Sequence, residues 1–115
     1  MTEQRLYSTQ DSCPVARTLN VVGDRWTILV LRDLSRGRRR YTELLGSLTG
    51  ISTNLLADRL KTLEQSKMVE QVPYSNHPPR SEYRLTSKGR AFAPVLRALK
   101  AYGDVWEPRT ASTDS

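Results

Sequence analysis

Hydrophobic residues first recur at helical spacing in residues 14–22. Val15, Leu19 and Val22 stand four and then three positions apart, which aligns their side chains along one face of a helix. Pro14 favours the start of this helix, because the amide hydrogen that proline lacks would be unpaired in a first turn in any case. The pattern therefore predicts a short first helix with one apolar face.

A second helix is predicted over residues 24–35, where apolar side chains occur on almost every side. The carboxylate of Asp24 can accept hydrogen bonds from the unpaired amides of the first turn, and Gly37 can end the helix. A helix that lacks a broad polar face is poorly suited to a surface. We therefore expect this helix to be buried at the centre of a helical domain.

The next two helical patterns are short, and a tight turn separates them. We expect helices over Tyr41–Leu48 and from the capping residue Ser52 to about Ser66, joined by a turn in which Gly50 can adopt a positive φ. Three leucines at positions i, i+4 and i+7 form the packed row of the second helix. Such a pair is a helix-turn-helix, whose second helix can enter the major groove of DNA. Its opposite face is polar or small and comprises Thr53, Asn54, Ala57, Asp58 and Lys61.

Two strand-like runs follow the helix-turn-helix. They cover Met68–Val72 and Glu82–Leu85, and the loop Pro73–Ser81 lies between them. A hairpin directly after a helix-turn-helix is the arrangement of a winged helix, in which the hairpin forms the wing. The predicted fold is therefore mainly α with a small β-hairpin.

The last pattern is a long apolar stripe. Thr86 is the expected cap of a last helix, and Pro94 inside it must kink the helix or leave a carbonyl oxygen unpaired one turn earlier. A stripe of this length exceeds what a small domain needs, so we expect it to pack against a second copy of the chain. Its members are Phe92, Val95, Leu96, Leu99, Tyr102 and Trp106.

Positive charge is concentrated on the predicted reading segment. The 115 residues include 18 Lys and Arg and 12 Asp and Glu, a formal net charge of +6. Residues 36–90 hold 11 of the basic and 5 of the acidic residues (11 − 5 = +6), and the rest of the chain holds 7 of each. This distribution suits a polyanion, and we expect double-stranded DNA. A polar start and the lack of a long apolar run predict a cytoplasmic protein without signal peptide or membrane span.

Other classes of function have less support. Cys13 is the single cysteine and His77 the single histidine, so we expect no disulfide within the chain, no metal site and no cofactor. A Cys–His nucleophile would join the start of the chain to the wing without an orienting third group, so we expect no enzyme. The alternative is a protein-docking adaptor or an RNA-binding protein, although only Tyr74 and Tyr83 could stack on RNA bases.

Three segments carry a resemblance to a known family. In the segments CPVARTLNVVGDRWTILVLRDL, RRRYTELLGSLTGISTNLLADRLKTLE and NHPPRSEYRLTSKGR, the chain resembles the HxlR-type transcriptional regulators, relatives of MarR within the winged-helix fold. The resemblance implies a homodimer on an inverted-repeat site, with residues 52–66 in the major groove and 73–81 on the flanking backbone or minor groove. It also implies helical dimerisation elements at both ends of the fold. The expected interface residues are Val15, Leu19, Leu96, Leu99, Tyr102 and Trp106.

Two positions depart from the pattern of the family. Lys67 stands where glycine usually follows the recognition helix, and a left-handed conformation there would cost roughly 1 kcal/mol. Gln71 stands where an arginine is common on the first strand of the wing, so one phosphate contact is expected to be missing. The expected organisation is a flexible arm over 1–12, a winged helix-turn-helix domain over 13–106 and a disordered tail over 107–115.

Individual side chains of the interface have competing interpretations. Asn54 could pair with adenine, or it could be a solvated residue of the first helical turn. Arg59 could reach a phosphate, or it could pair internally with a carboxylate such as Glu43. Arg80 suits the narrow, negative minor groove, whereas His77 is expected to be an exposed loop residue. The expected DNA-binding residues are Arg38, Arg39, Arg40, Thr42, Ser52, Thr53, Asn54, Ala57, Asp58, Arg59, Lys61, His77, Arg80 and Ser81.

Cys13 also has two interpretations. It could be a small apolar residue buried at the dimer interface. It could instead be a redox or electrophile sensor, because the start of a helix favours the reactive thiolate. The resemblance adds weight to sensing, since some members of the family sense quinones, aldehydes or oxidants through a cysteine near this position.

Overall fold

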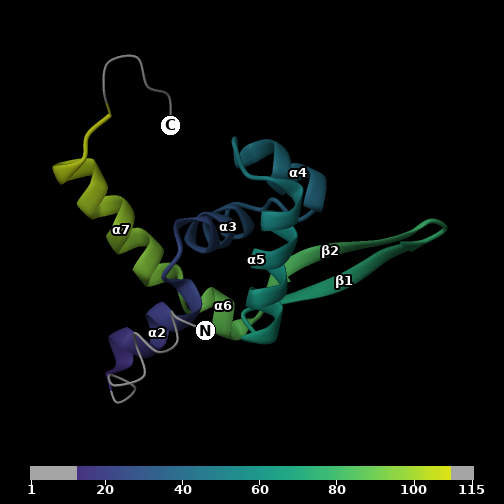
Figure 1. The fold of residues 1–115 in the computed structure, drawn as a ribbon, viewed down its shortest axis with the longest axis horizontal. Helices are drawn as coiled ribbons and strands as arrows, with labels where there is room; N and C mark the ends of the chain where they lie inside the picture. The colour runs from purple at the N-terminus through teal and green to yellow at the C-terminus, as the bar shows by residue number, and fades with distance from the viewer. Residues whose placement is uncertain (1–12, 110–115) are drawn as a thin grey trace.

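The computed structural model describes residues 13–109, and Figure 1 shows their arrangement. The elements are α2 (Pro14–Val22), α3 (Arg25–Ser35), α4 (Tyr41–Ser47), α5 (Thr53–Gln65), β1 (Val69–Asn76), β2 (Pro79–Leu85), α6 (Ser87–Arg90) and α7 (Ala93–Trp106). Helix α3 lies in the middle, the hairpin extends to one side, and α2 and α7 lie on the other side (Figure 1). The mainly α winged helix-turn-helix that the pattern predicted is confirmed.

Local sequence accounts for the ends of the central helices. Asp24 caps α3, since its Oδ1 accepts two backbone amides of the first turn at 2.6 and 3.1 Å. Ser52 caps α5, since its Oγ accepts the amide of Leu55 at 3.1 Å. Gly50 has a φ of 95° in the turn between α4 and α5. The hydroxyl of Tyr41 donates to a backbone carbonyl of α5 at 2.8 Å, which ties the two helices of the helix-turn-helix together.

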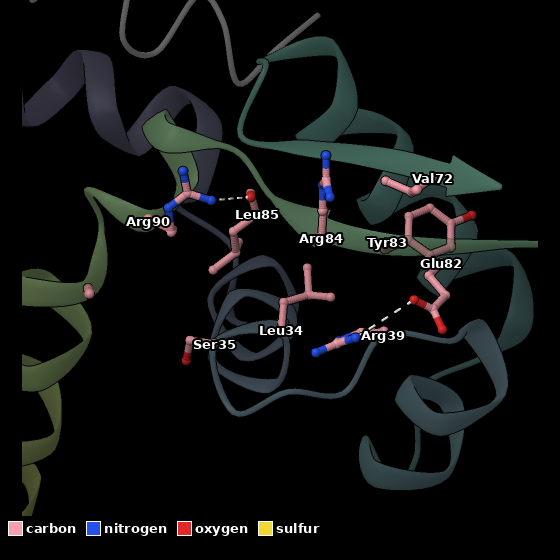
Figure 2. A pocket seen from close by; sticks show the side chains of 10 residues that line it. Leu34, Ser35, Arg39, Val72, Glu82, Tyr83, Arg84, Leu85 and Arg90 are labelled. Atoms are coloured by element: carbon pink, nitrogen blue, oxygen red, sulfur yellow. Dashed lines mark hydrogen bonds and ion pairs between the residues drawn. The ribbon is translucent and has the colours of Figure 1, made fainter. Parts of the chain in front are cut away.

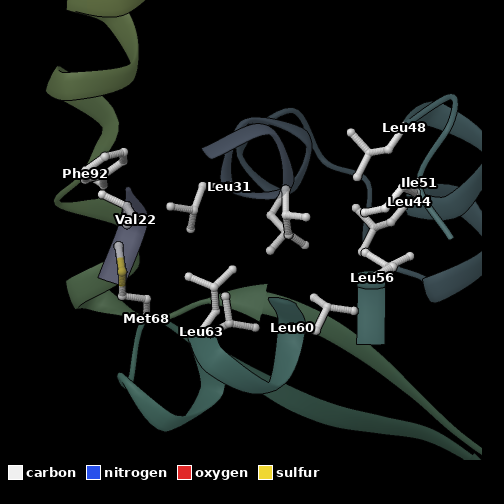
Figure 3. Close-up of a cluster of buried hydrophobic side chains, with 13 residues drawn as sticks. Val22, Leu31, Leu44, Leu48, Ile51, Leu56, Leu60, Leu63, Met68 and Phe92 are labelled. Atoms are coloured by element: carbon white, nitrogen blue, oxygen red, sulfur yellow. The ribbon is translucent and has the colours of Figure 1, made fainter. Parts of the chain in front are cut away.

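The hydrophobic core lies between α3, α4, α5 and the start of the hairpin (Figure 3). Val30 and Leu31 of α3 are fully buried, as the central position of this helix requires. The predicted leucine row of α5 is closed to solvent as well. The buried cluster comprises Val22, Val30, Leu31, Leu34, Leu44, Leu48, Ile51, Leu56, Leu60, Leu63, Met68, Val69 and Phe92.

The wing is longer than the sequence pattern predicted. Strand β1 continues to Asn76 and β2 begins at Pro79, so two residues form the turn. The expected loop over 73–81 is therefore wrong. Antiparallel strands pair through their backbones, and residues exposed on both faces need no alternation of apolar and polar side chains. The pairing is irregular between Pro73 and Ser75, as in a β-bulge.

The single last helix that we expected is also wrong. Thr86 does act as a cap, since its Oγ1 accepts the amide of Gly89 at 3.2 Å, but the helix that it begins ends at Arg90. Helix α7 begins at Ala93 and has Pro94 in its first turn. Proline in a first turn leaves no internal hydrogen bond broken, so the chain begins a new helix there.

The ends of the chain are only partly described. The expected arm 1–12 lies outside the described residues, and so do residues 110–115 of the expected tail. Residues 107–109 are exposed and belong to no helix or strand. Within the part of the chain that the structure describes, no helix is long and apolar enough to cross a membrane.

Candidate nucleic-acid interface

Helix α5 has one buried and one exposed face. Its leucine row packs in the core, which turns the opposite face outward. The hydroxyl of Ser52 accepts a backbone amide and can still donate its own hydrogen to a phosphate. Thr42, at the start of α4, is exposed too. The whole set predicted for the reading face is exposed: Thr53, Asn54, Ala57, Asp58 and Lys61.

Arg59 pairs within the protein, but not with the acid that we named. Its Nη2 lies 3.2 Å from Oδ2 of Asp24, and its Nη1 lies 3.2 Å from Oδ2 of Asp58. Glu43 is not its partner, because the carboxylate of Glu43 accepts backbone amides instead. The cap of α3 is thus tied to the middle of α5. The structure favours the internal interpretation of Arg59 over a phosphate contact.

Residues 38–40, here called the arginine link, join α3 to α4. The side chain of Arg38 makes no hydrogen bond or salt bridge among the described residues, whereas Arg39 and Arg40 both approach Glu82 of β2. The amide of Tyr83 donates to the carbonyl of Arg39 at 2.7 Å, so the link pairs with β2 through its backbone. Glu82 could not be identified from sequence pattern, since only the folded hairpin brings this acid to the link.

Glu43 anchors the start of α4 from within the helix. Its Oε1 accepts the amides of Arg39 and Arg40 at 2.8 and 3.0 Å. These two hydrogen bonds lower the pKa of the Glu43 carboxyl, and the bond from Arg39 has the larger effect. The positive charges of Arg40 and Arg38 lower this pKa further. Glu43 is therefore ionised at neutral pH and shapes the backbone of the link.

The wing presents its predicted residues in different settings. Arg80 lies on β2, is exposed, and has no side-chain partner among the residues described. His77 is exposed in the turn, as expected. Ser81 is half-buried on β2 opposite Pro73. Arg80 is therefore the more accessible of these two neighbouring residues.

Both departures from the family pattern have structural consequences. Lys67 has a φ of 70°, the left-handed conformation that glycine adopts more readily. The amide of Gln71 donates to the carboxylate of Glu64 at 3.2 Å, so this side chain turns back to α5. The expected loss of a phosphate contact at position 71 stays a prediction.

A cavity of about 550 Å³ lies beside the link, between the end of α3, the base of the hairpin and the α6–α7 junction (Figure 2). Three arginines line it, Arg39, Arg84 and Arg90, together with the acid Glu82. Nε of Arg84 donates to Glu70 at 2.8 Å, and Arg90 donates to a backbone carbonyl of β2 at 2.9 Å. Arg84 and Arg90 belong to the basic segment 36–90 but were not among the predicted site residues.

The terminal helices expose most of their apolar side chains. Leu99, Tyr102 and Trp106 are 48%, 63% and 67% exposed, and Val15 and Leu19 of α2 are exposed too. Leu96 is the exception among the predicted interface residues, because it packs partly against the core of the same chain. Val95 and Val105 are exposed apolar residues of α7 that the predicted interface did not include.

The residues considered for catalysis lie far apart. Cys13 is exposed at the start of α2, and His77 lies in the turn of the hairpin, on the opposite side of the molecule (Figure 1). They form no nucleophile pair. Between residues 13 and 109, no group of three or more His, Cys, Asp and Glu side chains could hold a metal ion.

Known proteins share both the sequence and the fold. A family model described as HxlR-like helix-turn-helix matches residues 21–111. The HTH-type transcriptional regulator sll1512 of Synechocystis sp. is 40% identical over 100 residues, which cover 87% of this chain and 74% of that protein. Regulator Rv3095 of Mycobacterium tuberculosis is 42% identical over 95 residues, which cover 83% of this chain and 60% of that protein. The match therefore leaves part of each relative uncovered.

Solved structures agree with these matches. The crystal structure of PA1607, a candidate transcription factor, superposes with a TM-score of 0.81 at 36% identity and covers 100% of this chain and 75% of that one. The redox regulator HypR in its oxidised form superposes with a TM-score of 0.77 at 30% identity and covers 86% of this chain and 100% of that one. The similarity extends well beyond the helix-turn-helix itself.

Proposed function

The chain belongs to the HxlR-like helix-turn-helix family of transcriptional regulators, and from this premise we propose that it binds double-stranded DNA as a cytoplasmic homodimer. Helix α5 enters the major groove, and the wing contacts the flanking backbone or the minor groove. Two copies related by a two-fold axis read an inverted repeat. Regulators of this class are generally not enzymes, which agrees with the separation of Cys13 and His77.

The exposed face of α5 supports this proposal most directly. Asn54 and Lys61 lie on that face while the opposite face is buried, so base edges can be reached without unfolding the domain. The adjacent link contributes Arg38, and the wing contributes Arg80, each without a partner among the described side chains. Phosphate contacts of this kind fix the register of a helix in its groove.

Binding to duplex DNA over a salt series tests the electrostatic part of the proposal. If a dimer contacts ~6–10 phosphates, affinity should fall roughly 10³–10⁵-fold between 50 and 200 mM salt. Footprinting should show an inverted repeat with half-sites about 10 bp apart, or a multiple of that. Single-stranded RNA serves as the comparison, and tighter binding to RNA than to any duplex would favour the alternative class.

A second candidate function concerns Cys13, which is exposed at the start of α2. We propose that its thiolate senses oxidants or electrophiles, and the similarity to a redox regulator supports this. With one cysteine per chain, oxidation can join Cys13 to its copy in the partner, or attach a reagent thiol as a mixed disulfide. Either change at the start of α2 would alter how two subunits pack and so the spacing of their recognition helices.

Oxidised glutathione provides a balanced test of sensing. The Cys13 thiolate attacks its disulfide, a mixed disulfide forms, and one glutathione thiolate leaves. DNA affinity should fall after treatment and return with dithiothreitol, while the Cys13→Ser variant binds DNA but ignores the reagent. An identical response of parent and variant would refute the sensing role and leave Cys13 as a structural residue.

A further inference from the structure

One acid of the wing faces the arginine link. Oε2 of Glu82 lies 3.4 Å from Nε of Arg40. Oε1 of Glu82 lies 4.0 Å from Nη1 of Arg39, and Figure 2 shows this second pair. The side chain of Glu82 is 25% exposed, whereas those of Arg39 and Arg40 are 63% and 50% exposed. Two cations that can reach a phosphate therefore share one carboxylate of their own chain.

The backbone fixes this arrangement. The amide of Tyr83, next to Glu82, donates to the carbonyl of Arg39 at 2.7 Å. The guanidinium of Arg40 lies over the ring of Tyr74, 4.4 Å from its centroid. The link cannot move away from Glu82 without breaking these contacts, so the acid stays close to both arginines even if each ion pair is weak.

The other acids near the interface have different partners. Glu43 accepts two backbone amides, Glu70 pairs with Arg84 at 2.8 Å, and Asp58 pairs with Arg59 at 3.2 Å. Among the described residues, Glu82 alone has its carboxylate in an ion pair with a side chain of the arginine link. It is thus the acid most directly opposed to a phosphate at this place.

We infer that Glu82 is an internal competitor of the DNA backbone for Arg39 and Arg40, an inference that rests on the proposed DNA-binding function. A phosphate that binds these guanidinium groups must displace the carboxylate or lie close to it, and the like charges repel. The two ion pairs are long and their arginines are at least half exposed, so the pairs contribute little to folding. The effect of Glu82 falls on DNA affinity, which it lowers for every sequence, because backbone contacts carry no sequence information.

The Glu82→Gln variant tests this role, since glutamine keeps the size and removes the charge. Affinity for the cognate duplex and for a random duplex should both rise roughly 3- to 10-fold at moderate salt. The slope of log K against log salt should steepen by about 2 per dimer, because the charge removed from each subunit permits one added phosphate contact, which contributes about 0.9. Glu82→Asp, which keeps the charge, should retain the slope of the parent protein.

Glu70→Gln is the matched control, because it adds the same charge on the same hairpin but releases Arg84 instead. It should change affinity less than 2-fold. In an Arg39→Gln/Arg40→Gln background, Glu82→Gln should have no effect, as a double-mutant cycle requires for coupled groups. Equal effects of Glu70→Gln and Glu82→Gln would mean that net charge alone acts, and weaker binding of Glu82→Gln would mean that Glu82 positions the link; either result overturns the inference.

Failure of this inference can be distinguished from failure of the proposed function. If the parent protein binds duplex DNA and Glu82→Gln binds identically, only the role of Glu82 is wrong. If the parent protein does not bind duplex DNA, the proposed function is wrong. Retention on heparin, a polyanion without bases, then still compares the variants: later elution of Glu82→Gln than of Glu70→Gln supports the competition, and equal elution overturns it.

Discussion

Asn54 is the residue at which one mutation can distinguish a base contact from mere exposure to solvent. Its side chain lies on the outward face of α5, and an amide can pair with both N6 and N7 of adenine. The Asn54→Ala variant should weaken binding to the cognate site by about 1–3 kcal/mol and relax preference at one base pair. Competition with a set of single-base operator variants measures both effects. Unchanged preference at every position would make Asn54 a solvated surface residue.

Arg80 provides the comparison with Asn54, because its charge can bind a DNA phosphate without contacting a base. Arg80→Ala should weaken all duplexes alike and reduce the salt slope by roughly 1 for each phosphate contact that is lost. Titrations of cognate and random duplex at several salt concentrations distinguish the two patterns. A loss confined to the cognate duplex would instead assign Arg80 to sequence reading in the minor groove.

The exposure of a single residue could be predicted from the sequence where the apolar period of its own helix determines which face it lies on. The exposure of Asn54 and Lys61 followed from the leucine row on the other face of the same helix. The pairing of Arg59 with Asp24 did not follow in this way, because Asp24 is far away in the sequence and only packing brings the two together. The proximity of Glu82 to the link could not be predicted for the same reason, since the hairpin register decides which acid faces the link.

At the scale of elements, two helices end in the same hydrogen-bonded motif with different residues at its critical position. After α3, the amides of Gly37 and Arg38 donate to the carbonyls of Leu34 and Asp33, with Gly37 at a φ of 99°. After α5, the next two amides again donate to carbonyls of the last turn, but Lys67 occupies the left-handed position at a φ of 70°. A Cβ disfavours this conformation, so the second ending is strained.

Lys67→Gly should therefore stabilise the protein by about 1 kcal/mol, and Gly37→Ala should destabilise it by a similar amount. Urea unfolding followed by circular dichroism measures both changes. The pair controls for the general effect of glycine on the unfolded chain, because one substitution adds a glycine and the other removes one at equivalent positions. A loss of stability in Lys67→Gly would show that contacts of the lysine side chain outweigh the backbone strain.

The elements with a strong period were predictable, and those held by backbone pairing were not. Helices α2 to α5 have apolar rows, α3 and α5 also have capping residues, and the pattern predicted each of the four helices. The outer half of the wing has few apolar side chains, so its strands gave no periodic signal. The apolar stripe runs from Phe92 into α7 without interruption, so its period could not reveal that a new helix begins just before Pro94.

At the scale of the whole molecule, the subunit is less compact than its length requires. Its radius of gyration is 15.6 Å, whereas a compact chain of this size has about 13 Å. The wing, α2 and α7 extend away from the central helices, and α7 has no buried residue. A large apolar surface on an extended helix is typical of a subunit that is completed by a partner.

Leu99→Asp and Trp106→Asp test whether α7 is the dimer interface. Both side chains are exposed in the single subunit, so an acid there should leave the fold intact yet cost several kcal/mol in a desolvated seam. Sedimentation should show monomers that have lost DNA affinity. Ala101→Asp, which adds the same charge away from the stripe, should remain dimeric. Stable dimers of both stripe variants would place the interface elsewhere.

The backbone hydrogen bond between Tyr83 and Arg39 ties the arginine link to β2 at the base of the wing. A two-stranded hairpin alone is marginally stable in water, so the link helps to hold the wing. This sets the boundaries at which the DNA-binding part could be exchanged between related regulators. A graft of the hairpin alone would separate the hairpin from the arginine link, with which it forms this backbone hydrogen bond. Residues 38–85 hold the link, the helix-turn-helix and the wing together, so a transplant of operator preference should move them as one piece onto a relative that keeps an α3 for them to pack against.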